Sequence, residues 1–135
     1  MMRQRKYALT RYPYLMNIRA IRGATQVAAN DAESIGAGSK ELLSAILDAN
    51  DLLIEDVISV FLTSTADLTA AFPASAARDI GFASTPLLCA QEIDVPGALA
   101  RTIRVMVHCM TKRSAQEIEH VYLHGASVLR KDLAQ

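Results

Sequence analysis

Long apolar runs and closely spaced cysteines are both missing from this sequence. No apolar stretch approaches the ~18 residues that a membrane span requires, so we expect a soluble protein with no membrane partner. Among the 135 residues the only cysteines are Cys89 and Cys109. Two isolated cysteines form no disulfide framework, and we expect both to be reduced thiols in an intracellular, cytoplasmic protein.

Acidic residues are absent from the first 30 positions, although the net charge of the whole chain is zero. Six basic residues precede Asp31, whereas from Asp31 onward there are 14 acidic residues and 8 basic ones. This balance argues against a nucleic-acid-binding surface over the main body of the chain. The arginines that remain in the main body therefore need individual explanations.

The common motifs of phosphate, dinucleotide and zinc-protease sites are also missing. The chain contains no GxxxxGKS/T, GxGxxG or HExxH pattern. His120 and His124 have the four-residue spacing of a helical pair, but Gly125 follows at once, and no carboxylate or cysteine completes a site with them or with His108. We therefore expect surface histidines and no metal site.

Length and composition fit one domain. Hydrophobic residues make up 51% and charged residues 21%, close to the averages for soluble globular proteins. The first fifteen residues are basic, and Pro13 interrupts any amphipathic helix, so we predict an extension outside the fold at 1–15 and a single domain at 16–135. A short organelle-targeting leader is the alternative interpretation of the extension.

Hydrophobic periodicity predicts the order strand, helix, strand, short helix, strand, strand, helix, strand. We expect the first helix to follow a cap at Asn30 or Asp31 and to fray in its first half, because Gly36 and Gly38 each weaken a helix by about 1 kcal/mol. A helix at 114–122 is predicted by a capping-box pattern at its start. Helices on one face of a mixed sheet define an α+β domain. The remaining expected elements are strands at 17–27, 57–63, 85–90, 102–110 and 126–130, and a short helix at 73–80.

Charged residues interrupt several of these apolar segments. Taken singly, Arg22, Arg78 and Arg104 are each typical of a side chain at a sheet edge or helix surface with a solvated head. Taken together they predict a pocket for carboxylates, because arginine offers a planar fork of donors for bidentate pairing. Glu92 follows Cys89 by three residues, an odd separation that places them on opposite faces of a regular strand. If both line one pocket, the strand must bend or end between them.

Five segments at 18–133 resemble, in order and spacing, the monofunctional chorismate mutases of the Bacillus type: IRGATQV, FPASAAR, CAQEIDV, IRVMV and HVYLHGASVLRKDL. The resemblance implies a ferredoxin-like subunit, assembled into a pseudo-α/β-barrel homotrimer with an active site in each cleft between subunits. It implies the cofactor-free rearrangement of chorismate to prephenate in phenylalanine and tyrosine biosynthesis. No proton transfer or covalent intermediate is needed, so catalysis consists of holding a compact conformer and placing positive charge where negative charge develops.

The resemblance also assigns roles to individual residues. Arg104 matches the arginine that faces the ether oxygen, Arg22 and Tyr122 match positions that bind carboxylate, and Glu92 and Cys89 match positions that contact the ring hydroxyl. For Phe72, Leu87 and Leu129, ordinary core packing is the alternative to ligand contact. The expected apolar wall comprises Phe72, Ala74, Leu87, Leu88 and Leu129, and the expected outer basic positions are Arg78 and Arg130.

Two features depart from the resemblance. Ser75 occupies a position where lysine is usual, so we expect weaker capture of the substrate before any effect on the chemistry. The tail lacks the proline that commonly follows the matched arginine and ends five residues after Arg130, which leaves its ordering over the site open. Two alternatives also remain: a non-catalytic trimer that binds a small carboxylate, and a trimeric enamine or imine deaminase of similar architecture.

Overall fold

A single mixed β-sheet organises the protein. The structure is a computed structural model that describes residues 16–133. The predicted extension at 1–15 lies outside the described residues. Two α-helices and several short 3-10 helices accompany five strands, in the order β1 (Asn17–Gln26), α2 (Ala32–Ala49), η2 (Ile54–Asp56), β2 (Val57–Ser64), α3 (Pro73–Asp79), η3 (Phe82–Ser84), β3 (Leu87–Gln91), β4 (Thr102–Thr111), η4 (Ala115–Glu117), β5 (Val121–Leu123) and η5 (His124–Leu133).

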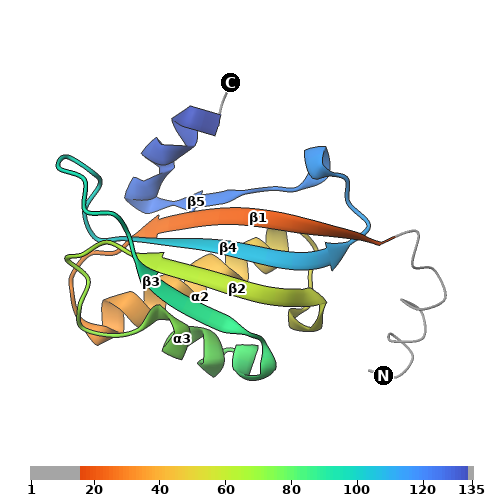
Figure 1. Cartoon of the computed structure of the whole chain (residues 1–135), viewed down its shortest axis with the longest axis horizontal. Coiled ribbons are helices and arrows are strands. Elements are labelled where there is room, and N and C mark those ends of the chain that lie inside the picture. Colours follow the sequence, from red (N-terminus) through yellow and green to blue (C-terminus); the bar gives the residue numbers. More distant parts are fainter. Residues whose placement is uncertain (1–15, 134–135) are drawn as a thin grey trace.

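The strands lie side by side in the order β3-β2-β4-β1-β5 (Figure 1). β4 pairs antiparallel with both β1 and β2, whereas β3 and β5 run parallel to their neighbours at the two edges. Each edge strand reaches its partner through a non-local connection. Segments far apart in the sequence are thereby brought together, and Thr63, Arg104 and Ala24 lie next to one another across three strands.

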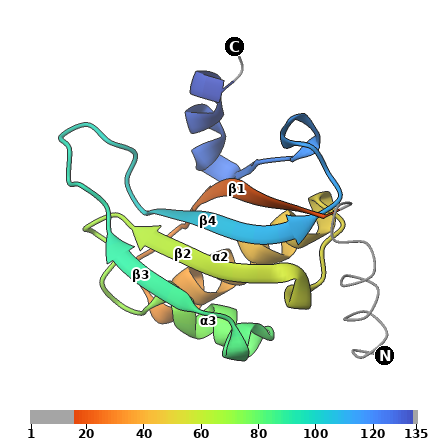
Figure 2. The same cartoon turned by 45° about the vertical axis from the view of Figure 1, so that its right-hand side comes forward.

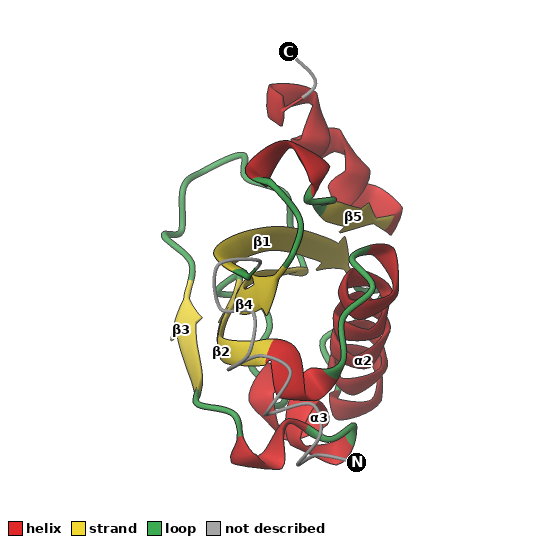
Figure 3. Ribbon diagram, turned by 90° about the vertical axis from the view of Figure 1, so that its right-hand side faces the viewer, coloured by secondary structure: helices red, strands yellow, loops and turns green. Residues whose placement is uncertain are grey.

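The two α-helices cover one face of the sheet (Figure 3). α2 packs against β1 and β5, and α3 packs against β2 and β3. The core between the layers combines one face of the strands with one face of α2, as the periodicity predicts. Its fully buried members include Ile21, Leu42, Ile46, Leu62 and Val107. The predicted α+β architecture with helices on one face is confirmed.

α2 is continuous from Ala32, so the predicted fraying of its first half is wrong. Asp31 caps the helix by accepting a hydrogen bond from the backbone N–H of Ser34 at 2.7 Å. Gly38 has a packing role, since a Cβ there would lie 2.5 Å from Cγ1 of Val27. The helix therefore approaches the end of β1 more closely than any larger residue allows.

Two further predictions fail between 114 and 130. The capping box forms, with the N–H of Ser114 donating to Glu117 at 2.9 Å, but only the short 3-10 helix η4 follows it. Ile118 is buried in the core, and Val121 pairs with Gly23 as part of β5. The strand predicted at 126–130 is wrong as well, because those residues lie in η5, which extends away from the sheet beyond β5 (Figures 1 and 2).

The second face of the sheet carries no helix (Figures 2 and 3). Apolar side chains stay exposed there, among them Ile18 at 65% and Leu88 at 58% of their full exposure, together with Phe61 at 41%. This surface is called the open face below, and it is formed by the outward residues of β1, β2, β3 and β4. Within residues 16–133, no helix is long and apolar enough to cross a membrane.

Candidate active site

A hollow of about 380 Å³ lies on the open face, above the centre of the sheet. It combines two arginines, a carboxylate, hydroxyl groups and an imidazole with apolar side chains. Four of the residues expected in the site lie here together, namely Arg22, Glu92, Arg104 and Tyr122. The other lining residues are Gly23, Phe61, Thr63, Val105, Met106 and His108.

Strand register explains why these residues meet. Arg22 on β1 and Phe61 on β2 both pair with Met106 on β4. Thr63 pairs with Arg104 two residues along, and directly paired residues share a face of the sheet. Tyr122 reaches the same face from β5, where it pairs with Ala24, itself the partner of Arg104 on β1. The hollow is thus assembled from four strands and the segment after β3.

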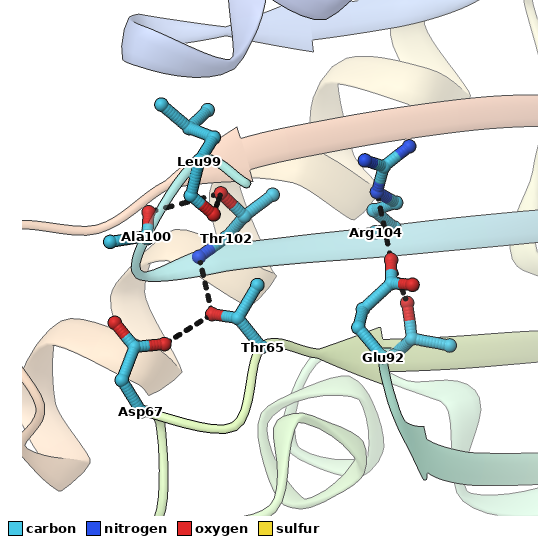
Figure 4. A network of polar contacts seen from close by, with 8 residues as sticks. Thr65, Asp67, Glu92, Leu99, Ala100, Thr102 and Arg104 are labelled. Atoms are coloured by element: carbon cyan, nitrogen blue, oxygen red, sulfur yellow. Dashed lines mark hydrogen bonds and ion pairs between the residues drawn. The ribbon is translucent and has the colours of Figure 1, made fainter. Parts of the chain in front are cut away.

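An ion pair between Arg104 and Glu92 is the central contact of the hollow (Figure 4). Nε of Arg104 lies 2.8 Å from Oε1 of Glu92, and the hydroxyl of Thr63 donates to the same oxygen at 3.0 Å. The Glu92 side chain is 26% exposed and that of Arg104 50% exposed. A partly buried carboxylate with two donors is satisfied, so Glu92 is accommodated in an otherwise apolar segment.

The guanidinium of Arg104 is held by one edge. Because its Nε is the nitrogen that contacts Glu92, the two terminal nitrogens remain directed away from the carboxylate, as Figure 4 shows. Arg22 contributes a second cation on the neighbouring strand, and its backbone N–H donates to Nδ1 of His120 at 2.9 Å. The arrangement suits an anionic ligand that accepts several hydrogen bonds from arginine.

Cys89 lies on the other face of the sheet. It pairs with Leu62, which is fully buried, and its side chain packs against the core. β3 ends at Gln91, but the N–H of Glu92 still donates to Ser64 at 2.9 Å, so the strand alternation continues through Glu92. The strand does end between the two residues, at Gln91, but the expectation that both side chains turn to the same side is wrong within this chain, because the odd separation places them on opposite faces.

The other expected residues lie away from the hollow. On α3, Ala74 is buried in the core, whereas Ser75 and Arg78 are exposed, and Phe72, which precedes the helix, is 73% exposed. Leu87 packs against the core. Leu88 is exposed on the open face, where it pairs with Phe61, and Leu129 is half-buried in η5. The side chain of Arg130 lies outside the described residues.

The sequence expectations did not assign Thr63, Phe61, Met106 or His108 to the site. A signal existed for two of them, because alternation along β4 already places Met106 and His108 on the same face as Arg104. Nothing comparable marks Thr63, whose neighbourhood depends on the pairing of β2 with β4.

Residues 16–133 contain no group of three or more histidine, cysteine or acidic side chains that could hold a metal ion. His124 instead lies 2.7 Å from the carboxylate of Glu41. Burial raises the pKa of the Cys109 thiol, with a smaller contribution from the charge of Asp56, and this keeps the thiol protonated and unreactive.

Fold and site together define a small α+β protein that presents arginines in a hollow on an uncovered sheet face. The chain matches the family model for chorismate mutase type I over residues 18–133, and it belongs to that family. It is 44% identical to the chorismate mutase AroH of Bacillus subtilis over 120 residues, which cover 88% of this chain and 94% of that protein. It is 45% identical to the chorismate mutase AroH of Thermus thermophilus over 117 residues, or 86% of this chain and 96% of that protein.

A solved structure shows the same similarity. The chain superimposes on a chorismate mutase from Clostridium thermocellum with a TM-score of 0.80 and 51% sequence identity. The superposition covers 82% of this chain and 98% of that one.

Proposed function

We propose that the protein catalyses the rearrangement of chorismate to prephenate in aromatic amino-acid biosynthesis. The observation that carries this proposal is the Arg104 guanidinium, which Glu92 holds through Nε at 2.8 Å inside the hollow. Its free terminal nitrogens suit a ligand oxygen that gains negative charge. Membership of the chorismate mutase type I family supports the same reaction.

Arg104 supplies the main electrostatic contribution. As the ether C–O bond of chorismate breaks and the new C–C bond forms, negative charge grows on the ether oxygen. A terminal N–H of Arg104 directed at that oxygen stabilises the transition state more than the ground state, which is the condition for acceleration. Because Glu92 fixes the guanidinium in advance, little reorganisation is needed at the moment of reaction.

The neighbouring residues hold the substrate. Arg22 and the Tyr122 hydroxyl are donors for a substrate carboxylate, and the second oxygen of Glu92 is an acceptor for the ring hydroxyl. Phe61 and Met106 add apolar contact surface beside these groups. Fixing both ends of the molecule favours the compact conformer in which the reacting carbons approach each other.

Assembly into a trimer would complete the site. The open face leaves Ile18, Phe61 and Leu88 exposed, and a second subunit packed there would bury them. Phe72, Ser75 and Arg78 lie outside the hollow of their own chain, so we assign them to the hollow of a neighbouring subunit. Light scattering on the purified protein should give the mass of three chains, and a monomer with full activity would contradict this assignment.

The direct test is a chorismate assay without added metal or cofactor. We expect chorismate to disappear and prephenate to form in equal amounts, and we expect Arg104→Ala to abolish most of the turnover. A stable, folded protein that leaves chorismate untouched would refute the proposal. Calorimetric binding of a different carboxylic acid by that inactive protein would indicate a binding module instead.

A further inference from the structure

Thr63 connects Glu92 of the ion pair to the neighbouring strand β2. It lies on β2, paired with Arg104 on β4, and its side chain is half-buried on the open face. Its hydroxyl donates to Oε1 of Glu92 at 3.0 Å. Because a carboxylate accepts hydrogen bonds but donates none, the direction of this contact is fixed.

Both contacts of Glu92 use the same oxygen. Oε1 accepts a hydrogen bond from the hydroxyl of Thr63 and lies 2.8 Å from Nε of Arg104. Two donors from different directions fix the position of that oxygen, and therefore the rotation of the whole carboxylate. Oε2 is left for a ligand, and the terminal nitrogens of Arg104 are left in the hollow.

Glu92 needs such a restraint, because it lies outside the regular sheet. β3 ends at Gln91, and the backbone of Glu92 keeps one hydrogen bond, from its N–H to Ser64. The segment that follows is exposed, with Ile93 at 86% of its full exposure. A glutamate side chain also has several rotatable bonds, so ordering it has an entropic cost that the Thr63 contact helps to offset.

We propose that Thr63 is a positioning residue whose hydroxyl holds Glu92 and, through Glu92, orients the Arg104 guanidinium toward the reacting oxygen. The inference rests on the proposed function and adds a residue to it. It predicts an effect on the chemical step, since the guanidinium interacts most strongly with charge that is present only in the transition state. Thr63 itself acts through Glu92 and not on the substrate.

Thr63→Val is the informative substitution, because valine keeps the branched shape that suits a strand and replaces the hydroxyl with a methyl group that cannot donate a hydrogen bond. We expect kcat to fall by a factor of about 10–100, as for loss of a hydrogen bond to a charged group, with KM changed by less than about threefold. Thr63→Ser restores a hydroxyl at the same place. It should recover most of the lost kcat.

Thr25→Val is the matched control. Thr25 also lies on a strand, is fully buried, and its hydroxyl has no hydrogen-bond partner among the described residues. The same chemical change at this position should leave kcat and KM at their wild-type values. A loss of activity in Thr63→Val that the control does not share then reflects the lost contact with Glu92.

An NMR measurement separates this inference from the proposed function. The Nε–Hε resonance of Arg104, assigned by its absence in Arg104→Lys, reports the contact with Glu92 without any substrate. Thr63→Val should shift it and Thr25→Val should not. The inference would be overturned if Thr63→Val kept the kcat of the wild type and showed an unchanged Nε–Hε resonance. It would also be overturned if Thr63→Val raised only KM, or if Thr63→Ser failed to restore kcat. Absence of turnover in the wild-type protein would instead overturn the proposed function.

Discussion

Replacing Arg104 by lysine tests the central geometry, because it keeps the charge and removes the fork. In the wild type, Nε contacts Glu92 at 2.8 Å while the terminal nitrogens are directed away from that carboxylate (Figure 4). Lysine has a single nitrogen, which can contact Glu92 or the ether oxygen but cannot be placed as well for both. We expect a loss of one preorganised donor, which costs about 2.7–4 kcal/mol or 10²–10³-fold in kcat.

The stability effect of the same substitution should be small. Arg104 is 50% exposed, and an ion pair this close to solvent contributes about 0.2–1 kcal/mol. We therefore expect Tm to fall by less than about 5 °C. Arg19→Lys is a matched control, since Nε of Arg19 also donates, to the backbone of Arg113 at 3.2 Å, outside the hollow. If Arg104→Lys keeps kcat within about threefold of Arg19→Lys, the fork is not required and the reasoning is refuted.

Three further substitutions test the packing, the cap and the proposed contribution of Ser75 to a neighbouring subunit's site. Gly23→Ala would place a Cβ 2.7 Å from Cδ1 of Ile46, and we expect this overpacking to cost about 1–3 kcal/mol in urea unfolding; an unchanged midpoint would contradict it. The N–H of Ser34 lowers the pKa of the Asp31 carboxyl. The stability that the Asp31 carboxylate adds is therefore present above its unfolded pKa of about 3.9, and it is lost as pH falls through the lower pKa of the folded state. The Tm difference between wild type and Asp31→Ala should therefore shrink below about pH 4, and a constant difference would argue against the charge. Ser75→Lys adds a cation on the exposed surface of α3 and should lower KM at low salt with kcat unchanged, whereas an equal KM at low and high salt would exclude steering.

Local sequence patterns correctly predicted the elements whose buried face repeats regularly, either at helical spacing or by strict alternation. The alternation at 102–110 gives β4, and the spacing of Leu42 and Ile46 gives the buried face of α2. The segment 114–122 fails because its helical composition competes with tertiary contacts. Burying Ile118 and pairing Val121 with Gly23 stabilise an extended chain, and neither contact can be read from the local sequence.

The glycines of α2 show a related limit. A helix propensity scale treats Gly38 as a weak point, yet its missing side chain is what allows the helix to approach Val27. The stabilisation from this close packing depends on Val27, which lies outside the helix, so a helix propensity scale does not include it. Propensity therefore gave the right element with the wrong estimate of its continuity.

The sequence predicted those residues of the candidate site whose position follows from the face of their own strand. It missed those whose position depends on which strands pair with each other. Glu92 and Arg104 were both expected in one pocket, but the hydroxyl that contacts Glu92 beside this ion pair comes from Thr63, a residue with no signal of its own. The odd separation of Cys89 and Glu92 was the better guide to their side chains, since the alternation of side chains continues to Glu92, one residue past the end of β3, and separates them. The position of the Glu92 side chain is therefore explained by its contacts with Arg104 and Thr63 on the neighbouring strands, without a bend in its own strand.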